Sequence, residues 1–159
     1  MRVLVISDSH GANSVIGDAI ETQNTADYVL FLGDGIRQFE DYSYLYPEKT
    51  FVAVRGNCDF FGREKLSETI LAGNKRIFMT HGHSYYVKAG LDEAINAAKG
   101  QNADILLFGH THVSYVGYEN GLYIMNPGSI ALPRRGKPSY GVIDITSAGI
   151  VPFIVEVRR

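Results

Sequence analysis

Short apolar runs alternate with amphipathic stretches over the first part of the chain. Three of these runs, rich in β-branched or aromatic residues, predict buried strands at 3–6, 28–32 and 51–54. Apolar residues recur at helical spacing over 15–20, which predicts a helix with Asn13 or Ser14 as its N-cap. A shorter helix is predicted around Ile36 and Phe39, which lie three residues apart.

The pattern changes after the third strand. Runs at 66–71 and 76–80 flank a turn signal at 72–74, which predicts an antiparallel pair. Apolar positions from Val87 to Ala98 predict a helix that ends at Gly100, and 105–108 predicts another buried strand. From residue 113 onward, turn signals separate short strands. The early order predicts a parallel sheet and the late hairpins a second, largely antiparallel one. We therefore expect a two-sheet α/β sandwich (αββα) of mixed sheets with helices on its outer faces, formed by one domain over 1–159.

Polar clusters follow the inner strands at the point where each strand ends. These clusters are Asp8-Ser9-His10, Gly33-Asp34-Gly35, Gly56-Asn57-Cys58-Asp59, His81-Gly82-His83 and Gly109-His110-Thr111-His112. All five histidines of the chain lie in them. Ligands collect beyond the carboxyl ends of strands in α/β sheets, so these clusters are expected to meet there. Residues two apart on an extended segment share a face, which predicts that Asp8 with His10, and His110 with His112, converge.

Taken singly, each of these residues has a simpler explanation. An Asp after a strand is usually a cap or turn residue, and a buried His usually has a hydrogen-bond partner. As a set they favour one shared site. Grouping these carboxylates, amides and imidazoles is costly unless a positive charge neutralises them. Mixed nitrogen and oxygen ligands suit Mn, Fe, Co, Ni or Zn, and their number exceeds what one ion needs. The sequence therefore predicts two divalent metal ions that share a bridging carboxylate.

Composition and charge narrow the possible partners. Hydrophobic residues make up 45% and charged residues 20%, with a net charge of -2 and a pI near 6.2. No overall basic field favours nucleic acid or an anionic membrane. Cys58 is the sole cysteine, which excludes an intrachain disulfide and a structural zinc site of the usual cysteine type. No apolar run is long enough to span a membrane or to form a signal-peptide core, so a cytoplasmic location is expected.

The ordered clusters resemble the motifs of the calcineurin-like metallophosphoesterases. The resemblance runs from Val3 to the Asn126-Pro127-Gly128-Ser129 segment and is nearest to the small bacterial and archaeal phosphodiesterases, which also carry Asn-Cys-Asp. It implies the two-sheet αββα fold. It also implies two metal sets with Asp34 as the bridge: Asp8, His10 and His112 at one ion, and Asn57, His81 and His110 at the other. By the same analogy Mn is expected first, with Mg, Ni, Co, Fe or Zn as alternatives.

The resemblance also implies a reaction, and this chain differs from the broader family at one position that bears on it. Hydroxide held by two ions would attack the phosphorus of a small phosphodiester, with Asp34, Asn57 and Cys58 as candidate catalytic residues. The broader family has a histidine where this chain has Cys58, and a thiol is a poorer acid–base partner at neutral pH. We therefore predict that esters with good leaving groups are favoured. A small packed residue is the alternative reading of Cys58, and the slightly favoured one.

Several assignments stay open at this stage. His83 and Arg55, and with less support Arg134 and Arg135, are candidate substrate contacts, although arginines near loops are usually solvated. The turn at 126–129 either shapes the pocket rim or is a plain turn.

Two other functions compete with a phosphodiesterase. A non-catalytic protein-interaction module is one, because this chain resembles the retromer subunit of vacuolar sorting in expected fold and in length. An Fe(II) oxygenase is the other, although its ligand triad needs fewer residues than are present. A homodimer is slightly favoured, and the natural substrate is not defined by the sequence.

Overall fold

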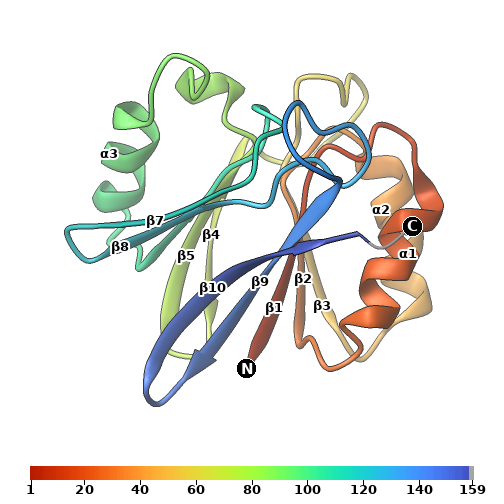
Figure 1. Cartoon of the computed structure of the whole chain (residues 1–159), viewed down its shortest axis with the longest axis horizontal. Coiled ribbons are helices and arrows are strands. Elements are labelled where there is room, and N and C mark those ends of the chain that lie inside the picture. Colours follow the sequence, from red (N-terminus) through yellow and green to blue (C-terminus); the bar gives the residue numbers. More distant parts are fainter. Residues whose placement is uncertain (158–159) are drawn as a thin grey trace.

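The computed structural model describes residues 1–157, which fold into two five-stranded sheets with helices on both outer faces (Figure 1). The first sheet contains β1 (Arg2–Ile6), β2 (Tyr28–Phe31), β3 (Thr50–Ala53), β9 (Ser139–Thr146) and β10 (Gly149–Glu156). The second contains β4 (Ser67–Ala72), β5 (Lys75–Thr80), β6 (Ile105–Leu107), β7 (Tyr115–Glu119) and β8 (Leu122–Asn126). The predicted αββα sandwich is confirmed, whereas the single domain over 1–159 stays a prediction.

The strand order of the first sheet is β10-β9-β1-β2-β3. β1, β2 and β3 are parallel neighbours, as the early strand–helix alternation predicts. The late hairpin β9–β10 does not join the second sheet as predicted, because β9 pairs antiparallel with β1. β1 is buried almost throughout, and an apolar strand of this kind needs a hydrogen-bonded neighbour on each side.

The second sheet has the order β4-β5-β6-β8-β7 and is mixed. β4–β5 and β7–β8 are antiparallel hairpins, but β5–β6 and β6–β8 are parallel pairs. The prediction of a largely antiparallel second sheet is therefore wrong. A helical crossover lies between β5 and β6, and such a connection returns the chain in the parallel direction.

Successive side chains along each strand point to opposite faces of the sheet, and the apolar ones form three core clusters. Val3 and Val5 of β1 face the second sheet and pack in the central cluster with Met79 of β5. Leu4 and Ile6 of the same strand face the opposite way, toward the helices of the first sheet. A third cluster joins the outer face of the second sheet to its own helix. Both faces of β1 are buried in this arrangement, which is why its sequence is a continuous apolar run.

Three helices cover the two outer faces (Figure 1): α1 (Asn13–Thr22), α2 (Ile36–Leu45) and α3 (Asp92–Gly100). Within 1–157 no side chain caps α1, whose N-cap position is Ala12, so the predicted cap at Asn13 or Ser14 is wrong. The helix predicted from Val87 begins only at Asp92, and a 3-10 turn, η1 (His83–Tyr85), precedes it. None of the helices in this part of the chain has the length and hydropathy needed to cross a bilayer.

An ion pair joins β1 to β9 and gives a first testable prediction. Arg2 and Asp144 are paired residues on the two strands, with Nε–Oδ1 and Nη2–Oδ2 distances of 2.8 Å. The guanidinium lowers the pKa of Asp144, so the pair stabilises the fold above the ordinary carboxyl pKa and is lost as pH falls through the lowered value. We expect Asp144→Asn to cost roughly 0.5–1 kcal/mol of unfolding free energy at neutral pH, measured by urea denaturation. The difference from the unchanged protein should vanish in acid; a difference that persists there would contradict this assignment.

Candidate metal centre

The five polar clusters lie at one end of the sandwich, beyond the carboxyl ends of β1, β2, β3, β5 and β6. Five of their ligand-type residues have left-handed backbone conformations: Asp8 (φ 55°), His10 (φ 45°), Asp34 (φ 62°), His110 (φ 66°) and His112 (φ 56°). Few residues other than Gly, Asn, Asp and His adopt this conformation. The chain therefore turns sharply at the three clusters that carry these residues and does not continue there as extended strand. Asp8 and His10 converge as expected, with His10 Nε2 4.0 Å from Asp8 Oδ1, but these segments are not extended, and the expected convergence of His110 with His112 is wrong.

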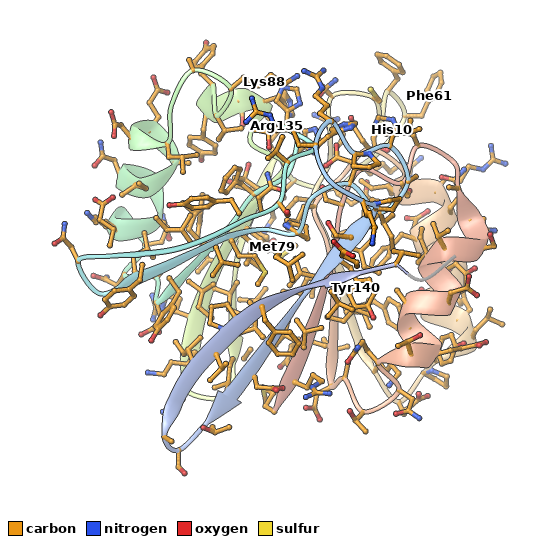
Figure 2. All side chains as sticks on the ribbon, viewed as in Figure 1. His10, Phe61, Met79, Lys88, Arg135 and Tyr140 are labelled. Carbon is orange, nitrogen blue, oxygen red and sulfur yellow. The ribbon has the colours of Figure 1, made fainter. Side chains whose placement is uncertain are left out.

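His110 and His112 consequently contribute to different groups. One group contains Asp8, His10 and His112, whose candidate ligand atoms all lie within 4.8 Å of one another. His112 Nε2 is 3.1 Å from Asp8 Oδ1 and 3.2 Å from His10 Nε2. Asp8 is fully buried, whereas His10, which is labelled in Figure 2, is partly open to solvent.

The second group forms around His81. Its Nε2 atom lies 3.0 Å from Asn57 Oδ1 and 3.2 Å from His110 Nδ1. Asp34 lies between the two groups, since its Oδ2 atom is 3.5 Å from His81 Nε2 and 3.9 Å from His10 Nε2. The structure thus brings together all seven residues that the sequence nominated as metal ligands, in two groups with one carboxylate between them.

Backbone carbonyls fix the orientation of two imidazoles. His81 Nδ1 lies 2.7 Å from the Leu32 carbonyl, and His112 Nδ1 lies 2.7 Å from the Leu132 carbonyl. A carbonyl oxygen only accepts, so each Nδ1 carries the proton and donates it. In the neutral ring the Nε2 lone pair then faces the cluster. Metal-bound histidines typically have their second ring nitrogen held in this way.

The lone pairs that converge in the two groups need a cation or a proton. Neutral His81 presents its Nε2 lone pair to Asn57 Oδ1, which is also an acceptor if its amide is oriented as in the structure. Asp8 Oδ1 is buried and, among residues 1–157, finds no donor when His112 is neutral. Facing acceptors at this spacing repel unless something positive lies between them. The donor set therefore fits divalent cations.

Burial and neighbouring charges shift the pKa values of these side chains in different directions. Burial would raise the pKa of Asp8, but hydrogen bonds from His112 and Ser7 and the charge of His81 hold it below its usual value. The hydrogen bond to Asp8 raises the pKa of His112. Burial, together with the charges of His81 and Lys88, lowers the pKa of His110 to about 4. His110 is therefore neutral at physiological pH and free to act as a ligand.

Asp59 holds the segments that present Asp34 and Asn57. Its carboxylate accepts four backbone N–H groups, from Asp34 (2.7 Å), Gly35 (2.8 Å), Gly56 (2.9 Å) and Ile36 (3.1 Å). Two of these donors are at the start of α2, so Asp59 caps that helix from a distant segment. Sequence reasoning included Asp59 in a motif but gave it no role.

Buried polar residues hold the other side of the centre. Ser7 Oγ donates to Asp8 Oδ2 at 2.6 Å, and Ser129 Oγ donates to the Asp8 carbonyl at 2.7 Å. The Asn126 amide donates to the Gly109 carbonyl at 3.0 Å and so supports the loop that carries His110. The 126–129 segment is thus more than a plain turn, since Asn126 and Ser129 are fully buried and hold residues of the centre.

The remaining candidates occupy the edge of the centre. Cys58 is exposed, which overturns its reading as a small packed residue. Neighbouring atoms partly desolvate its thiol and, together with the hydrogen bond to Asp34 and the charge of that carboxylate, raise its pKa to about 11. The His83 ring centroid is 5.4 Å from that of His81, and within 1–157 its buried Nδ1 has no partner. Arg55 Nη1 donates to the Gly62 carbonyl at 3.1 Å. Sequence reasoning missed Lys88, whose charge lowers the pKa of His110, because a single lysine within a predicted amphipathic helix carries no signal.

Comparisons with known proteins agree with the fold. The probable metallophosphoesterase YsnB of Bacillus subtilis is 35% identical over 147 residues, which cover 91% of this chain and 85% of that protein. The phosphodiesterase YfcE of Escherichia coli is 31% identical over 169 residues, covering 91% of this chain and 88% of YfcE. A solved structure of Vps29 from Entamoeba histolytica, complexed with zinc, has a TM-score of 0.73 at 24% identity and covers 98% of both chains.

The family itself is matched across nearly the whole chain. Residues 1–148 match the calcineurin-like phosphoesterase superfamily domain, and this segment contains every residue of the two ligand groups. With the αββα sandwich and the clustered Asp, Asn and His side chains, this match shows that the chain belongs to the calcineurin-like phosphoesterase superfamily.

Proposed function

We propose that this protein is a phosphodiesterase that hydrolyses small phosphodiesters with two divalent metal ions, Mn first among them. The observation that carries the proposal is the pair of ligand groups with Asp34 between them. Family membership supports hydrolysis of phosphate esters, and the phosphodiesterase name of YfcE supports a diester.

The ligand assignment follows the two groups. Asp8, His10 and His112 would hold one ion, and Asn57, His81 and His110 the other, with Asp34 shared. Divalent ions at such a centre lower the pKa of water and neutralise charge on phosphate oxygens.

The chain's own residues supply orientation and charge. The Leu32 carbonyl fixes the proton of His81 at Nδ1, so Nε2 remains available without any rearrangement of the ring. The N–H of Cys58 donates to Asp34 Oδ1 at 2.8 Å and leaves Oδ2 for the centre. Arg55, Lys88 and Arg134 add positive charge around the histidines, which favours an anionic substrate.

A hydrolysis assay tests the proposal. The protein is stripped of metal with a chelator and assayed with bis(4-nitrophenyl) phosphate before and after Mn is added. We expect release of 4-nitrophenol only with Mn. No release at saturating Mn, with the protein shown to be folded by circular dichroism, would refute the proposal.

The exposed thiol beside the centre predicts a strong dependence on the leaving group. A Cys58 pKa of about 11 makes the thiol a weak proton donor near neutral pH, so the departing oxygen receives little assistance. In a series of aryl methyl phosphates, kcat/KM should fall steeply as the pKa of the leaving phenol rises, and dialkyl esters should be slower by roughly 10²-fold or more. The same esters in Mn buffer without protein serve as the control. Equal rates for aryl and alkyl esters would count against this prediction.

A non-catalytic interaction module is the second candidate, and the likeness in fold to Vps29 is the observation that favours it. The complete ligand groups favour the phosphodiesterase. Under the alternative, the Mn-supplemented protein binds metal without hydrolysing the diester.

A further inference from the structure

A cavity of about 770 Å³ adjoins the proposed metal centre. Its walls come from the loops after β1 and β2, the start of α2 and the segment 58–64. His10, Asp34 and Cys58 line this cavity and also form a ligand-like group of the centre, so the two spaces are continuous. The volume falls within the ~300–1,000 Å³ typical of small-molecule sites. A phosphate bound at the centre would therefore place one of its ester substituents within reach of the cavity.

Two adjacent aromatic side chains form part of the cavity wall. Phe60 is 83% exposed and Phe61 is 98% exposed. Neither belongs to any of the three core clusters, so packing of the fold does not explain them. Figure 2 shows Phe61 at the same end of the molecule as His10, which lines the same cavity. Adjacent exposed phenylalanines beside a polar centre indicate a binding surface.

The segment that carries the two rings is held at both ends. The Asp59 carboxylate accepts the backbone N–H groups of Asp34 and Gly35, in the loop between β2 and α2. The Gly62 N–H donates to the Asp59 carbonyl at 3.0 Å. Arg55 Nη1 donates to the Gly62 carbonyl at 3.1 Å. A fixed backbone lowers the entropy that binding would cost, because only the aromatic side chains still have to be ordered.

Two glutamates lie in the same wall. Glu64 Oε2 is buried, and burial together with a hydrogen bond to Glu64 raises the pKa of Glu40. The two carboxyl groups are thus already paired, and the exposed aromatic rings are the feature left to select a ligand. A methyl or short alkyl substituent would not use the rings, whereas an aromatic ring would stack on a phenylalanine.

We infer that this cavity binds an organic substituent of the phosphate ester, and that this substituent is a planar aromatic group stacked on Phe60 and Phe61. The inference rests on the proposed phosphodiesterase function and defines its substrate class. Aryl esters and nucleoside esters both carry such a group.

Monoesters test the inference, because each has a single substituent to place. Binding of methyl phosphate, phenyl phosphate and adenosine 5′-monophosphate to the Mn-loaded protein is measured by calorimetry. We expect both aromatic ligands to bind on the order of tenfold more tightly than methyl phosphate, from stacking of one ring. The tighter of the two identifies the source of the aromatic group, an aryl ester or a nucleoside ester.

Variants connect the preference to the cavity. Phe60→Ala with Phe61→Ala should remove the preference, so that the aromatic esters bind no more tightly than methyl phosphate does. Tyr44→Ala, which removes an equally exposed aromatic ring outside the cavity, should leave the preference intact. Equal binding of all three esters, or a preference that survives the Phe60 and Phe61 substitutions, overturns the inference. So does a change of oligomeric state in the double variant without a change in ligand preference, which would assign the rings to a protein contact.

A parallel assay separates the inference from the proposed function. Wild-type protein is assayed with bis(4-nitrophenyl) phosphate under the same conditions. Hydrolysis without an aromatic preference overturns the inference alone. An aromatic preference without hydrolysis overturns the proposed function and supports an aromatic phosphate ligand at this cavity.

Discussion

Asp34→Asn should lower kcat/KM for an aryl phosphodiester on the order of 10³-fold in the presence of Mn. Asp34 is 3% exposed and lies between the two ligand groups, so this substitution removes one negative charge from the point that both groups share. An amide is a weaker ligand for a divalent cation and does not neutralise its charge. Loss of a single electrostatic stabiliser at a reacting centre commonly costs 10²–10³-fold, and a ligand shared by two ions should lie at the upper end.

The control for this experiment is the same chemical change at an exposed position. Asp18 lies on the solvent side of α1, so Asp18→Asn should retain full activity. Urea denaturation of both variants without metal should show that Asp34→Asn remains folded. A folded Asp34→Asn variant with activity within a few-fold of the unchanged protein would contradict the bridging role.

Asp59→Ala is expected to have the largest effect on stability. Four backbone N–H groups lose their shared acceptor, two of them at the N-terminus of α2, and the segments that carry Asp34 and Asn57 are no longer held together. Hydrogen bonds to a charged group contribute about 1.5–3 kcal/mol each in favourable cases, and these four share one partly buried carboxylate. We expect the unfolding free energy to fall by roughly 2–4 kcal/mol, measured by urea denaturation.

Asp27→Ala is the matched comparison. The Asp27 carboxylate accepts a single backbone N–H, from Arg2 at 2.8 Å, at an exposed position. Its removal should cost about 1 kcal/mol or less. If the two alanine variants were equally stable, Asp59 would not organise the site in the way the hydrogen bonds indicate.

The buried strands and the edge at which the ligands gather were predictable because they depend on local patterns. The apolar run before Asp8 and the one before Gly33 define strands whose ends must be polar. The confinement of all five histidines to such ends then marks one edge of the fold. Neither step needs knowledge of which distant strands pair.

The predictions that were wrong concerned features that depend on the pairing of distant strands or on local backbone conformation. The apolar pattern of β9 fits either sheet, and only pairing with β1 decides its place. The left-handed conformation at His110 and His112 sends their rings to different groups, and no periodicity encodes it. The absence of a local cap on α2 is likewise explained only by Asp59, a residue that lies more than twenty positions along the chain.

The number of manganese ions bound per chain tests the central claim most directly. Metal-free protein is dialysed to equilibrium against Mn and its metal content is measured by mass spectrometry, together with Asp34→Asn and Asp18→Asn. The two ligand groups predict two ions per chain in the unchanged protein and in Asp18→Asn, and fewer in Asp34→Asn. A folded protein that binds no Mn at saturation, or an Asp34→Asn variant that binds as much as the unchanged chain, would contradict it.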